Sequence, residues 1–242
     1  MTPRLDSTDD PFDRLVAAAT EAPFQGWDFS YLEGRWKEEA TPWSYRDAVL
    51  HRLTSAHSLL DMGTGGGEFL AALAPLPPYT AATEGYPPNI PIARKRLAPL
   101  GVDLRVVGDD NRLPFADEQF DLVISRHESY DPREIRRILK EGGIFLTQQV
   151  GGEDLMQLSE RLRPGTAHPF AHWTAEFAVD QLLAAGFAIL FQDEAQPLTH
   201  FMTSVPWSIS STPSRGKSKI SPSHVFVIVC IRCTLIFKRK GV

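Results

Sequence analysis

The chain has 242 residues, of which 43% are hydrophobic and 23% are charged, as in an ordinary soluble globular protein. Its 30 acidic and 25 basic residues give a net charge of −5, which disfavours a nucleic-acid backbone as the main partner. The N-terminal sequence has no apolar segment of the signal-peptide type and the chain has only two cysteines, so we expect a reducing, cytoplasmic compartment without a disulfide framework.

Residues 1–56 are predicted to form helices and an aromatic flap that precede the main domain. Residues 11–22 have the pattern of a short amphipathic helix, and residues 44–56 that of a second helix. The segment between them is rich in aromatic side chains: Phe24, Trp27, Phe29, Tyr31, Trp36 and Trp43. Such a cluster is typical of a packed flap and alternatively of a ligand cage, and a flap that closes over a cofactor would satisfy both interpretations.

Residues 57–198 alternate between predicted strands and helices. Strands are predicted at residues 57–62, 80–83, 102–107, 120–125, 144–149 and 187–192. Helices are predicted at residues 68–74, 90–97, 133–140 and 174–185. Strands joined by crossover helices indicate an α/β fold with a doubly wound, mainly parallel sheet.

A glycine-rich corner follows the first predicted strand, at the sheet edge where ligands bind in such folds. The corner, residues 61–67, contains Gly63, Gly65 and Gly67. The dinucleotide fingerprint requires a small residue where this chain has Glu68, so an NAD-type oxidoreductase is the less favoured alternative. A carboxylate at Asp61 would face a pyrophosphate unfavourably, but it suits a ligand that carries an ammonium group.

S-adenosylmethionine meets these requirements because it carries an ammonium group and a sulfonium but no phosphate. Its carboxylate can accept hydrogen bonds from the backbone N–H groups at the start of the next helix. Glu84 ends the second predicted strand, where a carboxylate can accept hydrogen bonds from both hydroxyls of a ribose. The alternative for Glu84 is an ordinary solvated acid at a strand end.

The order of these motifs resembles the methyltransferase type 11 family of class I S-adenosylmethionine-dependent enzymes. Residues 61–67 resemble the first motif of that family, and Glu84 resembles its acidic residue after the second strand. Residues 108–109, 113–115 and 120–121 match its third and fourth signature segments. The resemblance covers residues 58–150 and implies a Rossmann-like fold with S-adenosylmethionine as cofactor.

The resemblance also implies individual roles in the cofactor site. Thr64 belongs to the first motif together with the glycines, Asp109 would accept a hydrogen bond from the adenine amino group, and the backbone of Asp110 would lie beside it. The apolar segment 113–115 is expected to pack the loop under the sheet as well. No metal site is predicted.

The methyl acceptor is expected near residues 125–130, which follow the fourth predicted strand. His127 is the candidate general base or acceptor-orienting group, although a histidine hydrogen-bonded within the loop is an equal alternative. His172 and Trp173 are weaker candidates for the same pocket. The amino-methylating tetrapeptide with two prolines is missing at residues 125–128, and the similar residues 77–79 lie on the wrong edge of the sheet.

Together with the net charge, these features favour methyl transfer to a small molecule, without nucleic acid or membrane as partner. The alternative within the same fold is a protein that binds S-adenosylmethionine without methyltransferase activity.

The tail, residues 199–242, does not match the antiparallel seventh strand with which class I methyltransferases end. Residues 206–223 are rich in Ser, Pro and Lys, and the apolar run 225–237, which contains Arg232, is too short to span a bilayer. A CxxC in this run, Cys230 to Cys233, is interpreted as accidental. Another reading frame permits apolar segments like the missing strand, so we hypothesise a frameshift near residue 198. We therefore expect the sixth strand to lack its partner, which is an aggregation liability.

Overall fold

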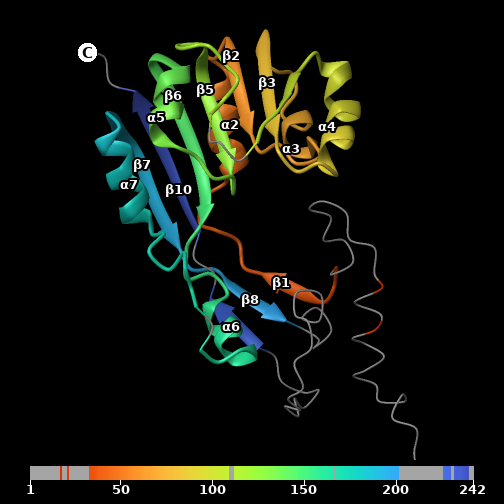
Figure 1. Cartoon of the computed structure of the whole chain (residues 1–242), viewed down its shortest axis with the longest axis vertical. Coiled ribbons are helices and arrows are strands. Elements are labelled where there is room, and N and C mark those ends of the chain that lie inside the picture. The colour runs from red at the N-terminus through yellow and green to blue at the C-terminus, as the bar shows by residue number, and fades with distance from the viewer. Residues whose placement is uncertain are drawn as a thin grey trace, which may run out of the picture. The chain divides into compact units, whose positions relative to one another are not determined.

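The computed structural model describes residues 17, 21, 33–108, 112–165, 167–201, 226–229 and 232–239. Two compact units are present (Figure 1). The larger unit consists of Ala40–Pro197 and Val229–Val242, and the smaller unit consists of Met1–Glu39 and Leu198–Ile228. Residues 17 and 21 are helical, whereas the rest of the helix predicted at residues 11–22 and most of the aromatic segment lie outside the described residues.

The larger unit contains a seven-stranded sheet in the order β4-β3-β2-β5-β6-β10-β7. The strands are β2 (Ser58–Met62), β3 (Tyr79–Glu84), β4 (Asp103–Val106), β5 (Phe120–Arg126), β6 (Leu139–Val150), β7 (Phe187–Ala195) and β10 (Arg232–Arg239). β2 to β6 pair in parallel, and β10 pairs antiparallel with both β6 and β7. The doubly wound, mainly parallel sheet is therefore confirmed.

Helices cover both faces of this sheet (Figure 1). They are α2 (Tyr45–Leu53), α3 (Glu68–Ala71), α4 (Asn89–Leu97), α5 (Pro132–Ile138) and α7 (Ala175–Ala184). The larger unit also contains η2 (Ala98–Leu100) and α6 (Met156–Leu162). Successive residues of β2 belong to opposite faces: Leu59 packs with α2, α3 and α4, and Leu60 packs with α5 and α7. The core therefore has two apolar layers, one on each side of the sheet.

The helix predicted at residues 133–140 ends earlier than its sequence pattern indicates. Asp131 caps α5 by accepting a hydrogen bond from the Arg133 backbone N–H (2.8 Å), and Pro132 occupies the first turn. Leu139 already has an extended backbone and pairs with Phe120 of β5, so residues 139 and 140 belong to β6. Parallel pairing with the neighbouring strand outweighs the helical pattern at this point.

The expectation that the sixth strand lacks a partner is wrong. β10, from the apolar run of the tail, lies between β6 and β7, with Thr234 opposite Gln148 of β6 and Asp193 of β7. A run of β-branched and apolar residues suits a strand that has a neighbour on each side. Strand pairing depends on this propensity and on backbone hydrogen bonds, so a segment that does not match the family motif can still form the strand. Cys233 lies in β10, and Cys230 lies outside the described residues.

The smaller unit contains a three-stranded sheet in the order β1-β8-β9, which the sequence patterns did not predict. Its strands are β1 (Trp36–Glu38), β8 (Leu198–Phe201) and β9 (Phe226–Val229). β1 and β8 are antiparallel, with Trp36 opposite Phe201. Beyond β1, the Glu39 backbone N–H donates a hydrogen bond to the Leu198 carbonyl (3.0 Å). The Leu198 backbone N–H in turn donates one to the Glu39 carboxylate (3.2 Å).

Within the larger unit, Asp121 in β5 fixes the start of the neighbouring strand β2. Its Oδ2 accepts hydrogen bonds from the backbone N–H groups of His57 (3.0 Å) and Ser58 (2.9 Å), and Lys140 Nζ contacts its Oδ1 at 2.9 Å. Although partial burial raises the pKa of this carboxyl, hydrogen bonds from Lys140 and Ser58 hold it below its usual value. The Phe-Asp segment predicted from the family resemblance therefore has a structural role.

We expect Asp121→Ala to destabilise the fold by about 2–3 kcal/mol, because it leaves two backbone donors and one ammonium group without their acceptor. Chemical denaturation at pH 7 measures this loss. Asp117→Ala is the control, because the Asp117 side chain is 75% exposed and pairs with Arg137 near the surface, so we expect less than about 1 kcal/mol. Equal losses in the two variants would contradict the strand-fixing role.

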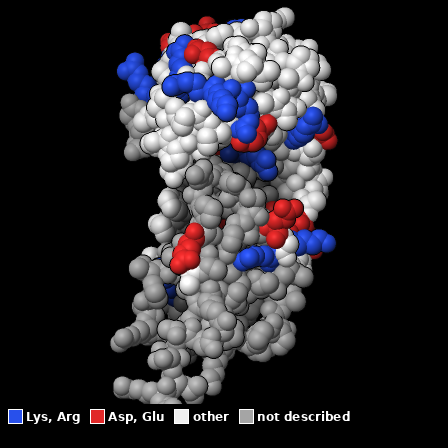
Figure 2. All heavy atoms as spheres, turned by 90° about the vertical axis from the view of Figure 1, so that its right-hand side faces the viewer, with Lys and Arg blue, Asp and Glu red and all other residues white. Residues whose placement is uncertain are grey.

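Positive charge is concentrated on α4 in spite of the acidic total. The last turn of this helix contains Arg94, Lys95 and Arg96, all exposed, and Arg96 pairs with Glu68 of α3. Figure 2 shows several Lys and Arg side chains on the upper part of the face that includes this edge of the sheet. Within the part of the chain that the structure describes, no helix has the length and apolar character needed to cross a membrane.

Candidate functional site

The glycine corner connects β2 to α3 and is held by hydrogen bonds to the adjacent strand β3. The backbone N–H of Thr64 donates to the Thr83 carbonyl (2.9 Å), and that of Gly63 donates to Thr83 Oγ1 (3.3 Å). Gly63, Gly65 and Gly67 all have positive φ values, of 61°, 64° and 80°. Residues with a side chain rarely adopt this conformation. The backbone conformation at these three positions therefore explains why each of them is a glycine.

Asp61 and Glu84, the two predicted cofactor carboxylates, lie on adjacent strands. Asp61 is opposite Ala82 in the parallel pair β2–β3, and Glu84 is two residues beyond Ala82, so both side chains belong to the same face of the sheet. Both residues are buried, with exposed fractions of 4% and 5%. The structure therefore brings these two predicted residues together at the carboxyl ends of their strands.

The carboxyl group of Asp61 is in an environment that suits a positively charged ligand. Burial raises its pKa to about 7 and the nearby charge of Glu84 acts in the same direction, while a hydrogen bond from Thr64 Oγ1 (2.7 Å) opposes them. Among the described residues, no Lys or Arg forms an ion pair with Asp61. A buried carboxylate without a cation is costly, so an ammonium group at this position would be favourable. The residues present thus fit S-adenosylmethionine.

Glu84 is held in place by its own loop. One carboxylate oxygen accepts a hydrogen bond from the backbone N–H of Tyr86 (2.7 Å), and the Glu84 carbonyl accepts one from Val107 (3.2 Å). These bonds connect the end of β3 to the segment after β4, where the adenine-binding residues are predicted. Asp109 and Asp110 themselves lie outside the described residues.

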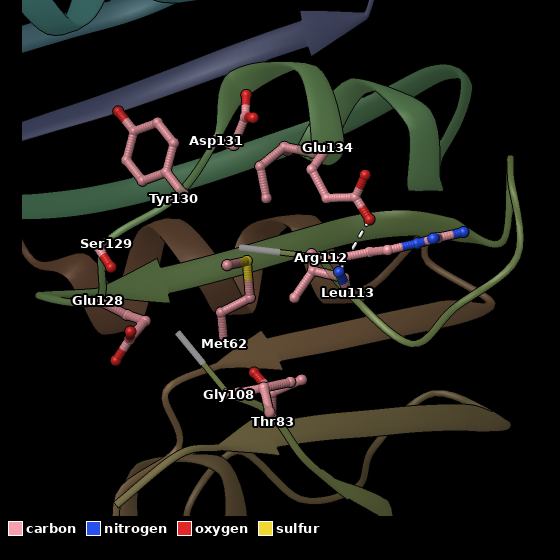
Figure 3. A pocket seen from close by; sticks show the side chains of 12 residues that line it. Met62, Thr83, Gly108, Arg112, Leu113, Glu128, Ser129, Tyr130, Asp131 and Glu134 are labelled. Atoms are coloured by element: carbon pink, nitrogen blue, oxygen red, sulfur yellow. Dashed lines mark hydrogen bonds between the residues drawn. The ribbon is translucent and has the colours of Figure 1, made fainter. Parts of the chain in front are cut away.

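A pocket opens at the carboxyl ends of β2, β3 and β5 (Figure 3), and the residues that line it from β2 and β3 are direct neighbours of Asp61 and Glu84 in the sequence and point to the opposite face of the sheet. It is lined by Met62 from β2, Thr83 from β3 and Gly108 after β4, and by Glu128 and Glu134 on the opposite side. Met62 directly follows Asp61, and Thr83 directly precedes Glu84. The pocket is therefore at the sheet edge where open α/β folds bind their ligands.

The loop that follows β4 packs as predicted. Leu113 and Phe115 are 7% and 6% exposed, and the Phe115 ring lies edge-on to that of Phe120, with centroids 4.9 Å apart. Glu134 and Arg137 of α5 fix the loop, since Leu113 N–H donates to Glu134 Oε1 (2.9 Å) and Arg137 Nη1 donates to the Phe115 carbonyl (2.8 Å). Figure 3 shows the first of these bonds at the rim of the pocket.

The histidine candidates do not line this pocket. His127 and His172 are exposed, and the His172 ring packs edge-on against Phe177 (5.2 Å between centroids). Trp173 packs against the ring of Tyr130, whose residue does line the pocket. The catalytic role of His127 stays a prediction. In the described part of the chain, no group of three or more His, Cys, Asp and Glu residues is arranged to hold a metal ion.

Glu128, which sequence analysis did not single out, reaches the pocket instead. Figure 3 shows its side chain extending from the end of β5 toward the ends of β2 and β3, away from the guanidinium of Arg112. Partial burial raises the pKa of its carboxyl, and the charge of Glu84 raises it further. The only sequence signal was its position in the segment 125–130, because a single sequence does not indicate which side chain of a loop turns inward.

Comparison with protein families agrees with this geometry. Residues 60–147 match the family model described as a methyltransferase domain, which covers β2 to β6 and the pocket. A solved structure of a candidate methyltransferase from Bacillus halodurans shares the fold, with a TM-score of 0.60 and 20% identity over 80% of this chain and 98% of that chain. Residues 60–147 are therefore similar to a methyltransferase domain, and the class I methyltransferases whose fold the chain shares use S-adenosylmethionine as methyl donor.

Two curated proteins are related to parts of the chain. A malonyl-[acyl-carrier protein] O-methyltransferase of Coxiella burnetii is 29% identical over 127 residues, which are 50% of this chain and 45% of that protein. A mitochondrial arginine-hydroxylase of Danio rerio is 37% identical over 103 residues, which are 36% of this chain and 32% of that protein. The matches span less than half the length of both relatives.

Proposed function

We propose that this protein transfers the methyl group of S-adenosylmethionine to a small-molecule acceptor, in the cytoplasm. The observation that carries the proposal is the buried carboxyl of Asp61, which lies beside a glycine corner and has Glu84 on the adjacent strand of the same sheet face. Asp61 would bind the ammonium group of the methyl donor, Glu84 its ribose hydroxyls, and the backbone of Gly63, Thr64, Gly65 and Gly67 its carboxylate end.

The donor supplies an activated methyl group, so the protein mainly has to position the acceptor and exclude water. Asp109 and the backbone of Asp110 are proposed to hold the adenine. Met62 and Tyr130 give the pocket apolar walls, and the carboxylates around it suit a small polar acceptor more than a polyanion. No triad of catalytic residues is required for a displacement of this kind.

A second candidate function is cofactor binding without methyl transfer. The arginine-hydroxylase from Danio rerio supports it, because that protein matches 36% of this chain and its name describes a different reaction. The fold and the glycine corner are compatible with both functions. Which of the two functions the protein has depends on whether the pocket also binds a methyl acceptor.

Incubation of the full chain with methyl-labelled S-adenosylmethionine and a panel of small amines, thiols, alcohols and carboxylic acids separates the two candidates. We expect S-adenosylhomocysteine to form faster with one class of acceptor than without acceptor, and Asp61→Asn to abolish this increase. Binding of the donor without product formation from any acceptor in the panel would favour the second candidate.

A further inference from the structure

The loop after β5 is shaped so that Glu128 turns toward the glycine corner. His127 has a φ of +67°, a conformation that is uncommon for a residue other than glycine, and its backbone N–H donates to the Gln148 carbonyl (2.9 Å). The Glu128 carbonyl accepts hydrogen bonds from Gln149 Nε2 (3.1 Å) and Ser125 Oγ (3.2 Å). Since Ser125, Gln148 and Gln149 are buried residues of the sheet, the orientation of Glu128 is fixed by the fold.

The side chain of Glu128 lies directly against Gly63, the first residue of the corner. A Cβ atom added to Gly63 would be 2.5 Å from Glu128 Oε2 and 2.8 Å from its Cβ and Cγ, so only glycine leaves room for this side chain. The charge of Glu84 raises the pKa of the Glu128 carboxyl. The Glu128 carboxylate is therefore close to both halves of the cofactor site, on β2 and on β3.

The covalent structure of the methyl donor indicates which of its atoms would occupy the space between these two halves of the cofactor site. Its sulfur joins the ribose to the amino-acid part, and the proposed function, on which this inference rests, assigns the ribose to Glu84 and the ammonium group to Asp61. The sulfur would then lie between these two groups, near Gly63, against which the Glu128 side chain packs. We propose that Glu128 recognises the positive charge of this sulfur and thereby makes the pocket prefer S-adenosylmethionine over the product S-adenosylhomocysteine, whose sulfur is neutral.

This preference has a functional consequence. The sulfonium loses its charge when the methyl group leaves, so the attraction to Glu128 disappears and the product dissociates more readily than the donor. Glu128 acts in this way as a specificity-determining residue. It needs no contact with the unidentified acceptor, so it can be tested without one.

Calorimetric titration of the full chain with S-adenosylmethionine and with S-adenosylhomocysteine tests the proposal. We expect Glu128→Gln, which removes the charge but keeps the shape, to lower the ratio of the two affinities about fivefold, mainly by weakening the donor. Glu128→Asp keeps the charge but withdraws it from the corner, so it should give an intermediate ratio. Glu141→Gln is the matched control, because Glu141 is an exposed carboxylate near the opposite end of the sheet, and its ratio should equal that of the wild type.

An unchanged ratio in Glu128→Gln, with both ligands still bound, overturns the role of Glu128 and leaves the proposed function standing. Failure of the wild-type chain to bind either ligand overturns the proposed function itself. If Glu128→Gln does not fold, the comparison of Glu128→Asp with the wild type decides the question, because this variant retains the charge.

Discussion

Asp61→Asn should weaken the binding of S-adenosylmethionine roughly 30-fold or more, because truncating one partner of a buried charge pair costs about 2–5 kcal/mol. The same substitution should stabilise the ligand-free protein at pH 8, since it removes a buried charge that only a hydrogen bond from Thr64 offsets. Weaker ligand binding together with higher stability of the ligand-free protein would show that the residue serves ligand binding at a cost in stability.

The stabilising effect should depend on pH. Burial raises the pKa of Asp61 to about 7 from its ordinary value of 3.8, so between these values the folded state holds a proton that the unfolded state has released. The stability of the ligand-free wild type therefore falls relative to Asp61→Asn as the pH rises from about 4 to 8, by about 4 kcal/mol in total. Thermal melting at several pH values measures this, with Asp180→Asn, an exposed acid in α7, as the control. A constant difference across this range would contradict the buried-charge interpretation.

Gly67→Ala should destabilise the protein by about 2–4 kcal/mol for two additive reasons. The residue has a φ of +80°, where an L-side chain is strained by about 1–2 kcal/mol. A Cβ atom there would also be 2.8 Å from Cγ of Leu97, the last residue of α4, which is fully buried. Chemical denaturation measures the loss.

Gly101→Ala is the matched control for this substitution. Gly101 has a similar φ of +70°, but an added Cβ would meet no atom within 4 Å. The control should therefore lose only the conformational part, about 1–2 kcal/mol. If both variants lose the same amount, close packing between the corner and α4 does not contribute to the requirement for glycine.

The alternating strands and helices of the larger unit could be predicted from sequence because each buried strand is short, apolar and ended by glycine, proline or a polar residue. The strand 57–62 differs from β2 by one residue at its start, and the helix 174–185 is longer than α7 by one residue at each end. The end of α5 could not be predicted, because Leu139 fits a helical pattern and only its pairing with β5 assigns it to a strand. The sheet β1-β8-β9 was missed because it joins segments more than 150 residues apart that have no shared pattern.

The cofactor side of the site was predictable to a greater extent than the acceptor side. Asp61, Glu84 and the three glycines follow strand ends, so parallel pairing alone brings them to one edge. Glu128 could not be identified in this way, since its inward orientation depends on the positive φ of His127 and on hydrogen bonds from the end of β6. Those are tertiary features.

The tail shows the limit of motif matching in another way. Residues 232–239 form a strand between β6 and β7, although they do not resemble the seventh strand of the family. A frameshift near residue 198 stays a prediction, and the nucleotide sequence decides it. Absence of a sensible alternate frame in that region would refute it.

Titration of the full chain with S-adenosylhomocysteine and, separately, with NAD tests the central claim most directly. The account predicts that one S-adenosylhomocysteine binds per chain, that NAD gives no binding heat, and that Asp61→Asn weakens the first interaction. Tight binding of NAD, or binding of S-adenosylhomocysteine that is unaffected by the substitution, would show that the buried carboxyl at the glycine corner does not select a phosphate-free cationic nucleoside.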